Sequence, residues 1–164
     1  MSEIIEISFV CLGNICRSPL AQGVFQDLVK REQLDDQIIV SSAGTSAWHV
    51  GDLPDQRMRQ TAQSKGIQLR SRARQFQRKD FRQFDLVLAM DESNLANLEE
   101  IAPTTLPKHK LMLFRSFDPE SDGNLDVPDP YYGGARGFEE VYQVVERTCP
   151  PLLDYIKANL MDSP

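Results

Sequence analysis

Segments typical of strands alternate with helical segments four times along this chain, and this alternation restricts the fold most. Apolar and β-branched runs predict strands at 4–10, 37–43, 84–90 and 110–114. Helical spacing and capping residues predict helices that follow them, at 18–29, 55–65, 91–101 and 138–160. We therefore expect an α/β fold with three layers, a parallel sheet with helices on both faces, in the flavodoxin-like manner.

Several local features refine this prediction. Ser18 before Pro19 predicts a helix start with Ser18 as the N-cap, and Asp91 is interpreted first as a second N-cap. Pro150 and Pro151 are expected to kink or interrupt the last helix. Residues 118–134 are rich in Asp, Pro and Gly, which indicates a long functional loop.

The length, the apolar runs and the cysteine count of the chain indicate its domain organisation and location. With 164 residues, we expect a single domain spanning 1–164. No apolar run is long enough to cross a bilayer, and the first eight residues lack the basic cluster of a secretory signal. Three cysteines without an export signal favour a cytoplasmic location rather than a disulfide scaffold.

Charge is distributed unevenly along the chain. There are 24 acidic and 18 basic residues, a net charge of −6, yet Arg57–Arg82 holds nine Lys/Arg and one acid. An acidic chain is a poor candidate for general nucleic-acid binding, so we expect no nucleic-acid and no membrane partner. The basic segment is either a solvated face or a surface that docks an acidic protein or receives an anionic substrate.

The loop between the first strand and the first helix carries the candidate chemistry. Arg17 follows Cys11 by six positions, with Gly13 and Asn14 between them. Gly and Asn readily adopt positive φ, so the loop can curl and turn its backbone N–H groups inward at a helix N-terminus. Such a loop is an anion cradle, and Arg17 adds a planar fork that can bind two phosphate oxygens.

Cys11 is the candidate nucleophile in this cradle. A positive environment favours the thiolate, since the pKa of a free cysteine near 8.5 falls to about 3.5–7.5 at helix N-termini. The Ser18 hydroxyl can also hydrogen-bond the sulfur. Asp129 precedes a proline that favours extended backbone, so its carboxyl can project as a proton donor. Tyr131 and Tyr132 are expected to wall a slot for a flat aromatic leaving group.

Three segments together resemble the low-molecular-weight protein tyrosine phosphatases: VCLGNICRSP at 10–19, SSAGT at 41–45 and DPYYG at 129–133. The resemblance runs through essentially the whole chain. It implies a four-stranded parallel sheet, no metal and no cofactor. It also implies hydrolysis of phosphotyrosine, in proteins or as an aryl phosphate monoester, through a cysteinyl-phosphate intermediate, with inorganic phosphate as product. The partners would be tyrosine-phosphorylated proteins, and we expect a monomer or weak self-association.

The resemblance also implies a role for each matched residue. Cys11 would be the nucleophile, Arg17 the phosphate clamp and Asp129 the general acid. Ser18 would lower the pKa of the thiol, while Asn14 and Ser42 support the loop. The phosphate would be bound by Leu12, Gly13, Asn14, Ile15, Cys16, Arg17 and Ser18. The phenyl ring would be flanked by Leu12, Trp48, Tyr131 and Tyr132.

Some residues keep two interpretations. Cys16 either forms a reversible disulfide with Cys11 that protects it from over-oxidation, or packs under the loop as a thiol. Trp48 is either a pocket wall or an ordinary core or loop residue. His49 could reach the slot, but we interpret it as a surface residue. Cys149 lies on a helical apolar stripe and is predicted to be structural.

Three other functions are less well supported by the residues. Arsenate reduction on this scaffold needs further cysteines, and the only one downstream is Cys149. For phosphoarginine hydrolysis, the resemblance implies a smaller polar residue where this chain has Ile15. A non-catalytic phosphate-binding module would lack the cysteine, the arginine or the aspartate, and all three are present.

Overall fold

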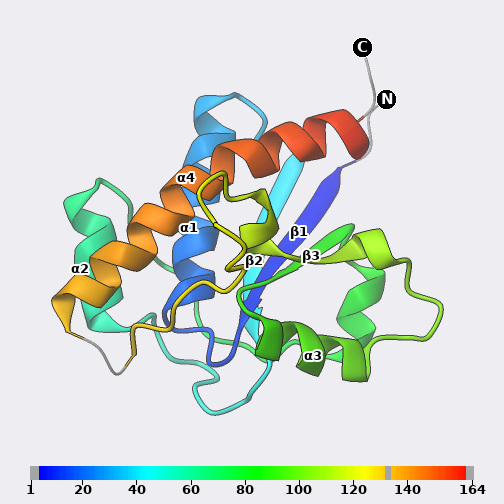
Figure 1. Ribbon diagram of the computed structural model, residues 1–164, viewed down its shortest axis with the longest axis horizontal. Helices are drawn as coiled ribbons and strands as arrows, with labels where there is room; N and C mark the ends of the chain where they lie inside the picture. The colour runs from blue at the N-terminus through cyan, green and yellow to red at the C-terminus, as the bar shows by residue number, and fades with distance from the viewer. Residues whose placement is uncertain (1–3, 132–133, 162–164) are drawn as a thin grey trace.

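A computed structural model describes residues 4–131 and 134–161 of the chain (Figure 1). Four parallel strands form one sheet in the order β2-β1-β3-β4. The strands are β1 (Ile5–Cys11), β2 (Ile38–Gly44), β3 (Leu86–Ala89) and β4 (Leu111–Leu113). The helices are α1 (Arg17–Arg31), α2 (Gln56–Ser64), α3 (Glu92–Ile101) and α4 (Ala135–Asn159). Short 3₁₀ turns are η1 (Arg78–Arg82), η2 (Lys108–Lys110) and η3 (Phe114–Phe117). The α/β architecture expected from the sequence is confirmed.

Alternate residues of β1 enter two different cores, which explains why this strand is apolar on both faces. Ile7 and Phe9 belong to the core beneath α1 and α4, whereas Val10 belongs to the core beneath α3 and η1. The Phe9 ring meets Phe25 and Phe114 edge-on, at centroid distances of 5.8 and 5.3 Å. Figure 1 shows α1 and α4 on one side of the sheet and α3 on the other. A central parallel strand buried in this way is a rigid base for the loop that follows it.

Helix α1 begins two residues earlier than the sequence predicts. Cys16 is its N-cap, so Ser18 and Pro19 are its second and third residues. Pro19 fits because the first N–H groups of a helix have no partner within it, and a proline there loses nothing. The Ser18 hydroxyl does not cap the helix and is turned instead toward Cys11.

Helix α4 passes without interruption through Pro150 and Pro151, so of the kink or interruption expected there, the interruption is wrong. A proline inside a helix costs about 3 kcal/mol, whereas each large apolar side chain that becomes buried contributes about 1.5–3 kcal/mol. The buried apolar residues of α4 lie on both sides of the two prolines: Phe138, Val141, Tyr142, Val144, Val145, Cys149, Leu152, Leu153 and Ile156. Packing of this stripe therefore outweighs the local cost.

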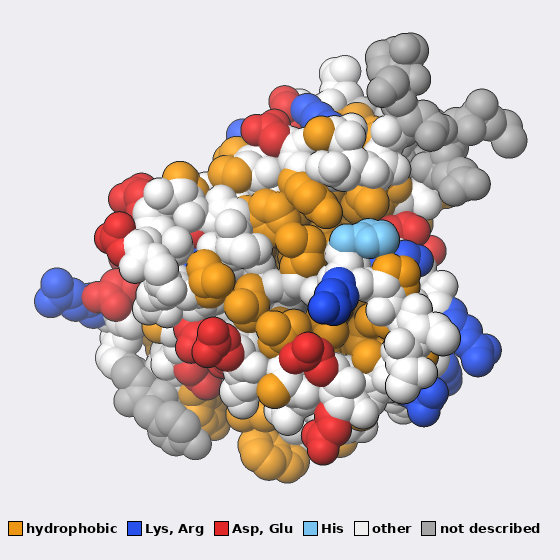
Figure 2. Space-filling model, turned by 45° about the vertical axis from the view of Figure 1, so that its right-hand side comes forward, with side chains coloured by type: hydrophobic (Ala, Val, Ile, Leu, Met, Phe, Trp, Pro, Cys, Tyr) orange, Lys and Arg blue, Asp and Glu red, His pale blue; other side chains and the backbone are white. Residues whose placement is uncertain are grey.

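Charged side chains of both signs are spread over the surface. On the face drawn in Figure 2, several Lys and Arg side chains project from the lower right-hand edge, and others lie at the centre and the left edge among Asp and Glu side chains. Within the described part of the chain, no helix has the length and apolar character needed to cross a membrane.

Candidate active site

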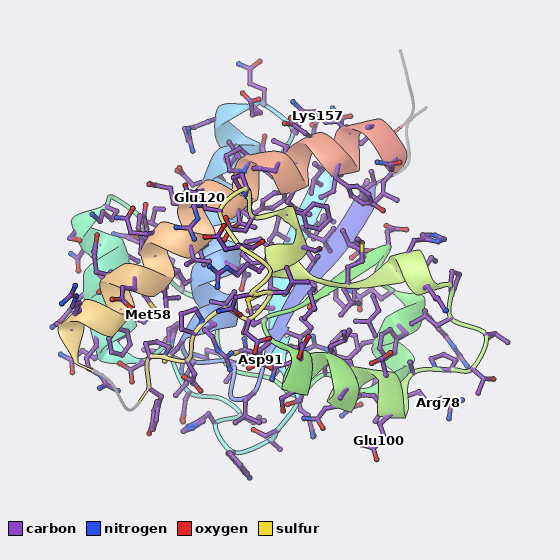
Figure 3. The ribbon with its side chains drawn as sticks, in the orientation of Figure 1. Met58, Arg78, Asp91, Glu100, Glu120 and Lys157 are labelled. Atoms are coloured by element: carbon purple, nitrogen blue, oxygen red, sulfur yellow. The ribbon has the colours of Figure 1, made fainter. Side chains whose placement is uncertain are left out.

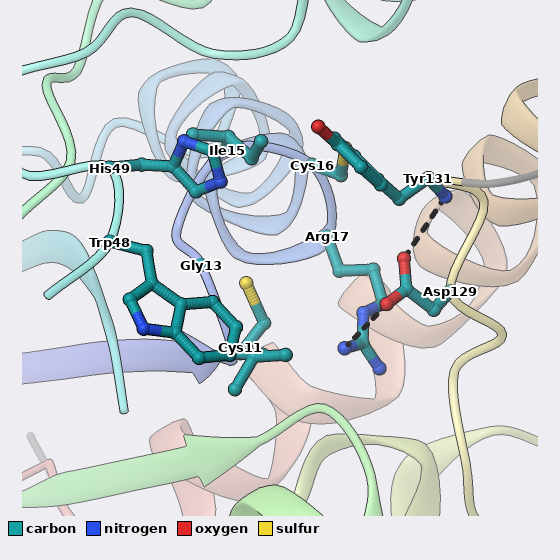
Figure 4. Close-up of a pocket in the computed structure, with 10 residues that line it drawn as sticks. Cys11, Gly13, Ile15, Cys16, Arg17, Trp48, His49, Asp129 and Tyr131 are labelled. Atoms are coloured by element: carbon teal, nitrogen blue, oxygen red, sulfur yellow. Dashed lines mark hydrogen bonds and ion pairs between the residues drawn. The ribbon is translucent and has the colours of Figure 1, made fainter. Parts of the chain in front are cut away.

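A small cavity lies at the carboxyl end of β1, where the order in which strands are added to the sheet reverses. The chain leaves β1 toward β2 on one side and later returns to β3 on the other, and such a switch point opens a crevice between loops. Three loops line this cavity of about 90 Å³ (Figure 4). Its lining residues are Cys11, Leu12, Gly13, Ile15, Cys16, Arg17, Trp48, His49, Asp129 and Tyr131.

Asn14 holds the loop after β1 in its curled shape. It has a φ of 59°, in the left-handed region that Asn tolerates, while Gly13 does not share the positive φ that its residue type allows. The Asn14 amide donates to Ser18 Oγ at 2.8 Å and to Ser42 Oγ at 3.0 Å. Its carbonyl accepts from the backbone N–H of Arg74 at 3.0 Å. The loop is thus tied to β2, to α1 and to a distant segment by one buried side chain.

Gly44 allows the end of β2 to approach this loop closely. A Cβ at Gly44 would lie 2.7 Å from the carbonyl oxygen of Leu12, closer than side-chain atoms come to backbone. The following residues fasten the contact, because Thr45 N donates to Cys11 O at 2.8 Å and Ser46 N donates to Leu12 O at 3.0 Å. The glycine of the SSAGT segment therefore shapes the loop, although it touches no reacting group.

The Cys11 sulfur lies inside the curled loop among hydrogen-bond donors. Its Sγ is 3.0 Å from Ser18 Oγ and accepts from Asn14 N at 3.3 Å. Among the described residues, no backbone carbonyl accepts from the N–H groups of Gly13, Ile15 or Cys16. These groups, with the N-terminus of α1, are available to bind an anion beside the sulfur.

Arg17 is buried and held from two sides at the rim of the loop. Its Nη1 donates to Asp91 Oδ2 at 2.6 Å and to the carbonyl of Val127 at 3.1 Å, and its Nη2 lies 3.6 Å from Asp129 Oδ2. Burial opposes the charge of the guanidinium, but the nearby Cys11 sulfur and Asp91 carboxylate outweigh it and raise the pKa of Arg17. The guanidinium therefore remains a fixed cation at the cavity.

Asp91 has two functions, and its interpretation first as a helix cap covers one of them. Its Oδ1 caps α3 by accepting from Asn94 N at 2.7 Å, as predicted. Its Oδ2 also orients Arg17. Asp91 follows β3 directly, and the parallel pairing of β3 with β1 brings the ends of the two strands together. This pairing places Asp91 beside Arg17 at the cavity.

Asp129 stands at the mouth of the cavity, opposite Cys11 in Figure 4. Its side chain is 44 % exposed. One carboxylate oxygen accepts from Tyr131 N at 3.1 Å, and the other faces Arg17. A carboxyl group that is both oriented and open to water is placed to exchange protons with a bound molecule and with solvent.

Aromatic side chains form the outer rim. Trp48 lines the cavity but is 76 % exposed, so it is not a core residue. His49 also lines the cavity while its side chain stays 31 % exposed, so it is a surface residue that does reach the slot. Its ring fills the space beside Gly13, where a Cβ would lie 3.1 Å from the imidazole. Tyr131 lies opposite, with its ring centroid 6.4 Å from that of His49, and Tyr132 lies outside the described residues.

Asp118 lies away from the cavity and anchors the loop that carries Asp129. Its buried carboxylate accepts from Arg115 Nε at 2.8 Å and from Arg147 Nε, on α4, at 2.8 Å. Burial would raise the pKa of Asp118, but hydrogen bonds from Arg147 and Arg115 outweigh it and lower the pKa to about 2. Arg115 also donates to the carbonyl of Asp126 at 2.8 Å. The acidic segment is therefore fastened to α4 at Asp118 and to η3 at Asp126, three residues before Asp129.

The remaining cysteines are buried. Cys16 contributes to the cavity wall, and Cys149 is packed in the core beneath α4 as predicted. Burial, followed by the charge of Asp55, raises the pKa of the Cys16 thiol well above its ordinary value. Residues 4–131 and 134–161 contain no group of three or more His, Cys, Asp or Glu side chains placed to hold a metal ion.

Comparison with known proteins agrees with this arrangement. The family model for low molecular weight phosphotyrosine protein phosphatases matches residues 6–162. A low molecular weight protein-tyrosine-phosphatase of Streptomyces coelicolor is 44% identical over 153 residues, covering 93% of both chains. A protein tyrosine phosphatase of Entamoeba histolytica, solved with Hepes in its active site, superposes with a TM-score of 0.89 at 37% identity and covers 94% of this chain and 97% of its own. A Drosophila arginine phosphatase superposes with a TM-score of 0.87 at 34% identity, covering 94% and 99% respectively.

Proposed function

Because this chain belongs to the low molecular weight phosphotyrosine protein phosphatase family, we propose that it hydrolyses phosphotyrosine through a phosphorylated Cys11. One observation carries the proposal. The Cys11 sulfur, which the buried Ser18 hydroxyl contacts from behind, lines one small cavity with the guanidinium of Arg17 and the loop after β1, and the Asp129 carboxyl lies at its mouth. These are a nucleophile, an anion cradle and a proton donor in one place.

In the first step the Cys11 thiolate attacks phosphorus in line with the tyrosyl oxygen. An S–P bond forms while the P–O bond to the ring breaks. Asp129, protonated, gives its proton to the departing oxygen, so the ring leaves as a neutral phenol. Support for the thiolate comes from the Ser18 hydroxyl at 3.0 Å and the Asn14 N–H at 3.3 Å. Arg17 and the loop N–H groups stabilise the equatorial oxygens of the transferring group.

In the second step water attacks the cysteinyl phosphate. Asp129, now ionised, takes a proton from this water, the S–P bond breaks, and Cys11 regains its thiolate as inorganic phosphate leaves. The same carboxyl therefore acts as acid and then as base. Its exposure of 44 % supports both steps, because the water must reach it from solvent.

The cavity favours a flat, narrow substituent on the phosphate. Ile15 and Leu12 give it apolar walls, and Trp48 and Tyr131 add aromatic surface at the mouth. A phenyl ring can pack there, whereas a short phosphoserine side chain would not bring its phosphate to the Cys11 sulfur while its backbone stayed outside. We propose Leu12, Trp48 and Tyr131 as the ring-binding residues, with Tyr132 as a further one from its sequence position.

Phosphoarginine hydrolysis is the nearest alternative, since a structural relative is a Drosophila arginine phosphatase. Ile15, buried in the cavity wall, favours the phenyl ring because a guanidinium would meet hydrocarbon without a hydrogen-bond acceptor there. Arsenate reduction is disfavoured because Cys149 is buried on α4 and does not line the cavity.

Comparing kcat/KM for four substrates tests the proposed function. We expect phosphotyrosine to be hydrolysed at least about 100-fold faster than phosphoserine and phosphoarginine, because the ring-binding contacts are lost with either, at about 1.4 kcal/mol per tenfold. Arsenate with a thiol reductant should give no turnover. Phosphoarginine hydrolysis equal to that of phosphotyrosine would contradict the proposal.

Cys16 is proposed to protect Cys11 from irreversible oxidation. Peroxide would oxidise the Cys11 thiolate to a sulfenic acid, and the Cys16 thiol would then displace water to form a disulfide that a dithiol can reduce. After peroxide and then dithiothreitol, wild type is expected to recover most of its activity and Cys16→Ser little. Equal recovery by the two proteins would remove this function and leave Cys16 as a packed thiol.

Four further expectations from the sequence are also our proposals. The chain 1–164 is proposed to form one domain, to act as a monomer or weakly self-associating protein, and to work in a reducing cytoplasm. Tyrosine-phosphorylated proteins are its proposed partners. Size-exclusion chromatography with light scattering measures the second of these directly.

A further inference from the structure

We propose that a groove leading away from the catalytic cavity binds an acidic segment of the phosphotyrosine protein, on one side of the phosphotyrosine. The inference rests on the proposed function and names a feature of its substrate. It is carried by the continuity of the groove with the cavity and by a cluster of three cations at its far end, Arg78, Lys79 and Arg82. We call these three residues the η1 basic cluster.

The groove is continuous with the cavity and follows α3. Leu12 lines both the catalytic cavity and a groove of about 740 Å³. Arg78 in turn lines both this groove and a further hollow of about 520 Å³. Figure 3 shows Asp91 at the start of α3, Glu100 near its end and Arg78 beyond. A peptide whose phosphotyrosine enters the cavity can therefore extend along α3 toward the η1 basic cluster.

The walls of the groove suit an extended peptide. Besides Leu12, they combine polar side chains that can hydrogen-bond a backbone with two apolar ones, Phe76 and Ile101. The exposed side-chain amides of Gln75, Gln77 and Asn97 are groups of the kind that binds a peptide main chain. The polar residues of the groove are Thr45, Ser46, Gln75, Gln77, Arg78, Asn97 and Glu100.

The η1 basic cluster keeps its full positive charge. In the described part of the chain, no carboxylate forms an ion pair with any of its three members, which are all exposed. The one acid of the basic segment, Asp80, is buried and is already bound to Arg74 Nη2 at 2.9 Å and to Gln77 N at 2.7 Å. Glu100 is the single acid among the described residues lining the groove and hollow, against three cations.

The cluster is also held in place, so that a ligand need not order it. Asp80 closes a capping box with Gln77 at the start of η1. Phe81 is buried in the same turn and packs edge-on against Phe76 at 4.9 Å. Three cations on a turn anchored in this way make a surface with little ordering cost for its backbone.

Charge also explains why the acidic segment should lie on this side and not the other. The opposite rim of the cavity carries Asp129, and the loop before it carries Glu120, Asp122 and Asp126. An acidic segment there would meet like charge, whereas beyond Glu100, near the end of α3, it reaches three cations in a protein whose net charge is −6. An acidic peptide segment is therefore expected to leave the cavity toward the η1 basic cluster, although the protein as a whole is acidic.

Phosphotyrosine peptides with displaced charge test the inference. One carries three glutamates several residues before the phosphotyrosine, one carries them after it, and a third is neutral. We expect one of the two acidic peptides to exceed the neutral one by about tenfold in kcat/KM at about 0.02 M salt, since exposed ion pairs contribute modestly and three act together. The preference should largely disappear at about 0.5 M salt.

A matched pair of variants locates the effect. Arg78→Gln/Lys79→Gln/Arg82→Gln should bring the preferred peptide to within about twofold of the neutral one. Lys30→Gln/Arg31→Gln/Lys157→Gln removes the same charge from exposed residues at the ends of α1 and α4 and should keep the preference. Both variants should hydrolyse nitrophenyl phosphate as wild type does, because none of these residues lines the cavity.

The outcomes separate this inference from the proposed function. If all peptides are hydrolysed equally by wild type, or if both triple variants lose the preference alike, the inference is overturned while phosphotyrosine hydrolysis stands. If no peptide is hydrolysed but nitrophenyl phosphate is, the protein substrate itself is refuted. Binding of anionic vesicles by the η1 basic cluster without any peptide preference would likewise overturn the inference.

Discussion

Replacing Cys11 by alanine is expected to lower kcat for phosphotyrosine by at least about 10⁴-fold, because removal of a covalent nucleophile leaves no alternative first step. The cradle does not depend on the sulfur alone, since Asn14 also holds the loop through Ser18 and Ser42. Phosphate should therefore still bind to Cys11→Ala, with a dissociation constant within about tenfold of wild type. Stopped-flow kinetics and calorimetric titration with phosphate measure the two quantities.

Cys16→Ser serves as the control for the loss of a thiol beside the cavity, and it should retain kcat within a few-fold under reducing conditions. Far-UV circular dichroism checks that each variant is folded. Residual kcat within about 100-fold of wild type in Cys11→Ala would show that another group attacks phosphorus, and the mechanism would fall.

Replacing Asp129 by asparagine is expected to slow hydrolysis according to the leaving group. The tyrosyl group of phosphotyrosine leaves as a poorly stabilised phenolate unless its oxygen is protonated, so cleavage of phosphotyrosine should slow by about 10²–10⁴-fold. Nitrophenol needs little protonation to leave, so formation of the phosphoenzyme from nitrophenyl phosphate should slow far less. A series of aryl phosphates measures this difference. The rate of P–O cleavage should fall more steeply with the pKa of the leaving phenol in Asp129→Asn than in wild type.

Asp122→Asn is the matched control, because it makes the same substitution in the same acidic loop and lies outside the cavity lining. Its φ of 50° is a conformation that Asn tolerates well, so the variant should fold normally. Equal slowing of every aryl phosphate by Asp129→Asn would mean that this carboxyl only positions the substrate, for example through Arg17.

Much of the fold could be predicted because its signals are local. The strand that ends at Cys11 is apolar on both faces, and the loop after it contains Asn14, which does adopt positive φ. Asp91 caps α3 as its place in the sequence indicates. The exact residue at which α1 begins could not be predicted from Pro19. The first N–H groups of a helix have no partner within it, so a proline is accepted at the third helical position as well as at the first.

The contacts between distant segments could not be predicted. Asp91 reaches Arg17 across 74 positions, and Arg147 reaches Asp118 across 29. No local pattern encodes such pairs, since each depends on how strands and helices pack. His49 is a similar case, because its place at the cavity follows from the missing side chain of Gly13 in another loop.

The most direct test of the central claim is to trap phosphate on the Cys11 sulfur. In Asp129→Asn with nitrophenyl phosphate, the first step needs little acid while the second lacks its base, so the intermediate should accumulate. We expect a burst of about one nitrophenolate per enzyme, and mass spectrometry of the acid-quenched protein should find one phosphoryl group on the peptide containing Cys11. A burst without a phosphorylated Cys11 peptide, or phosphate on any other residue, would contradict the account.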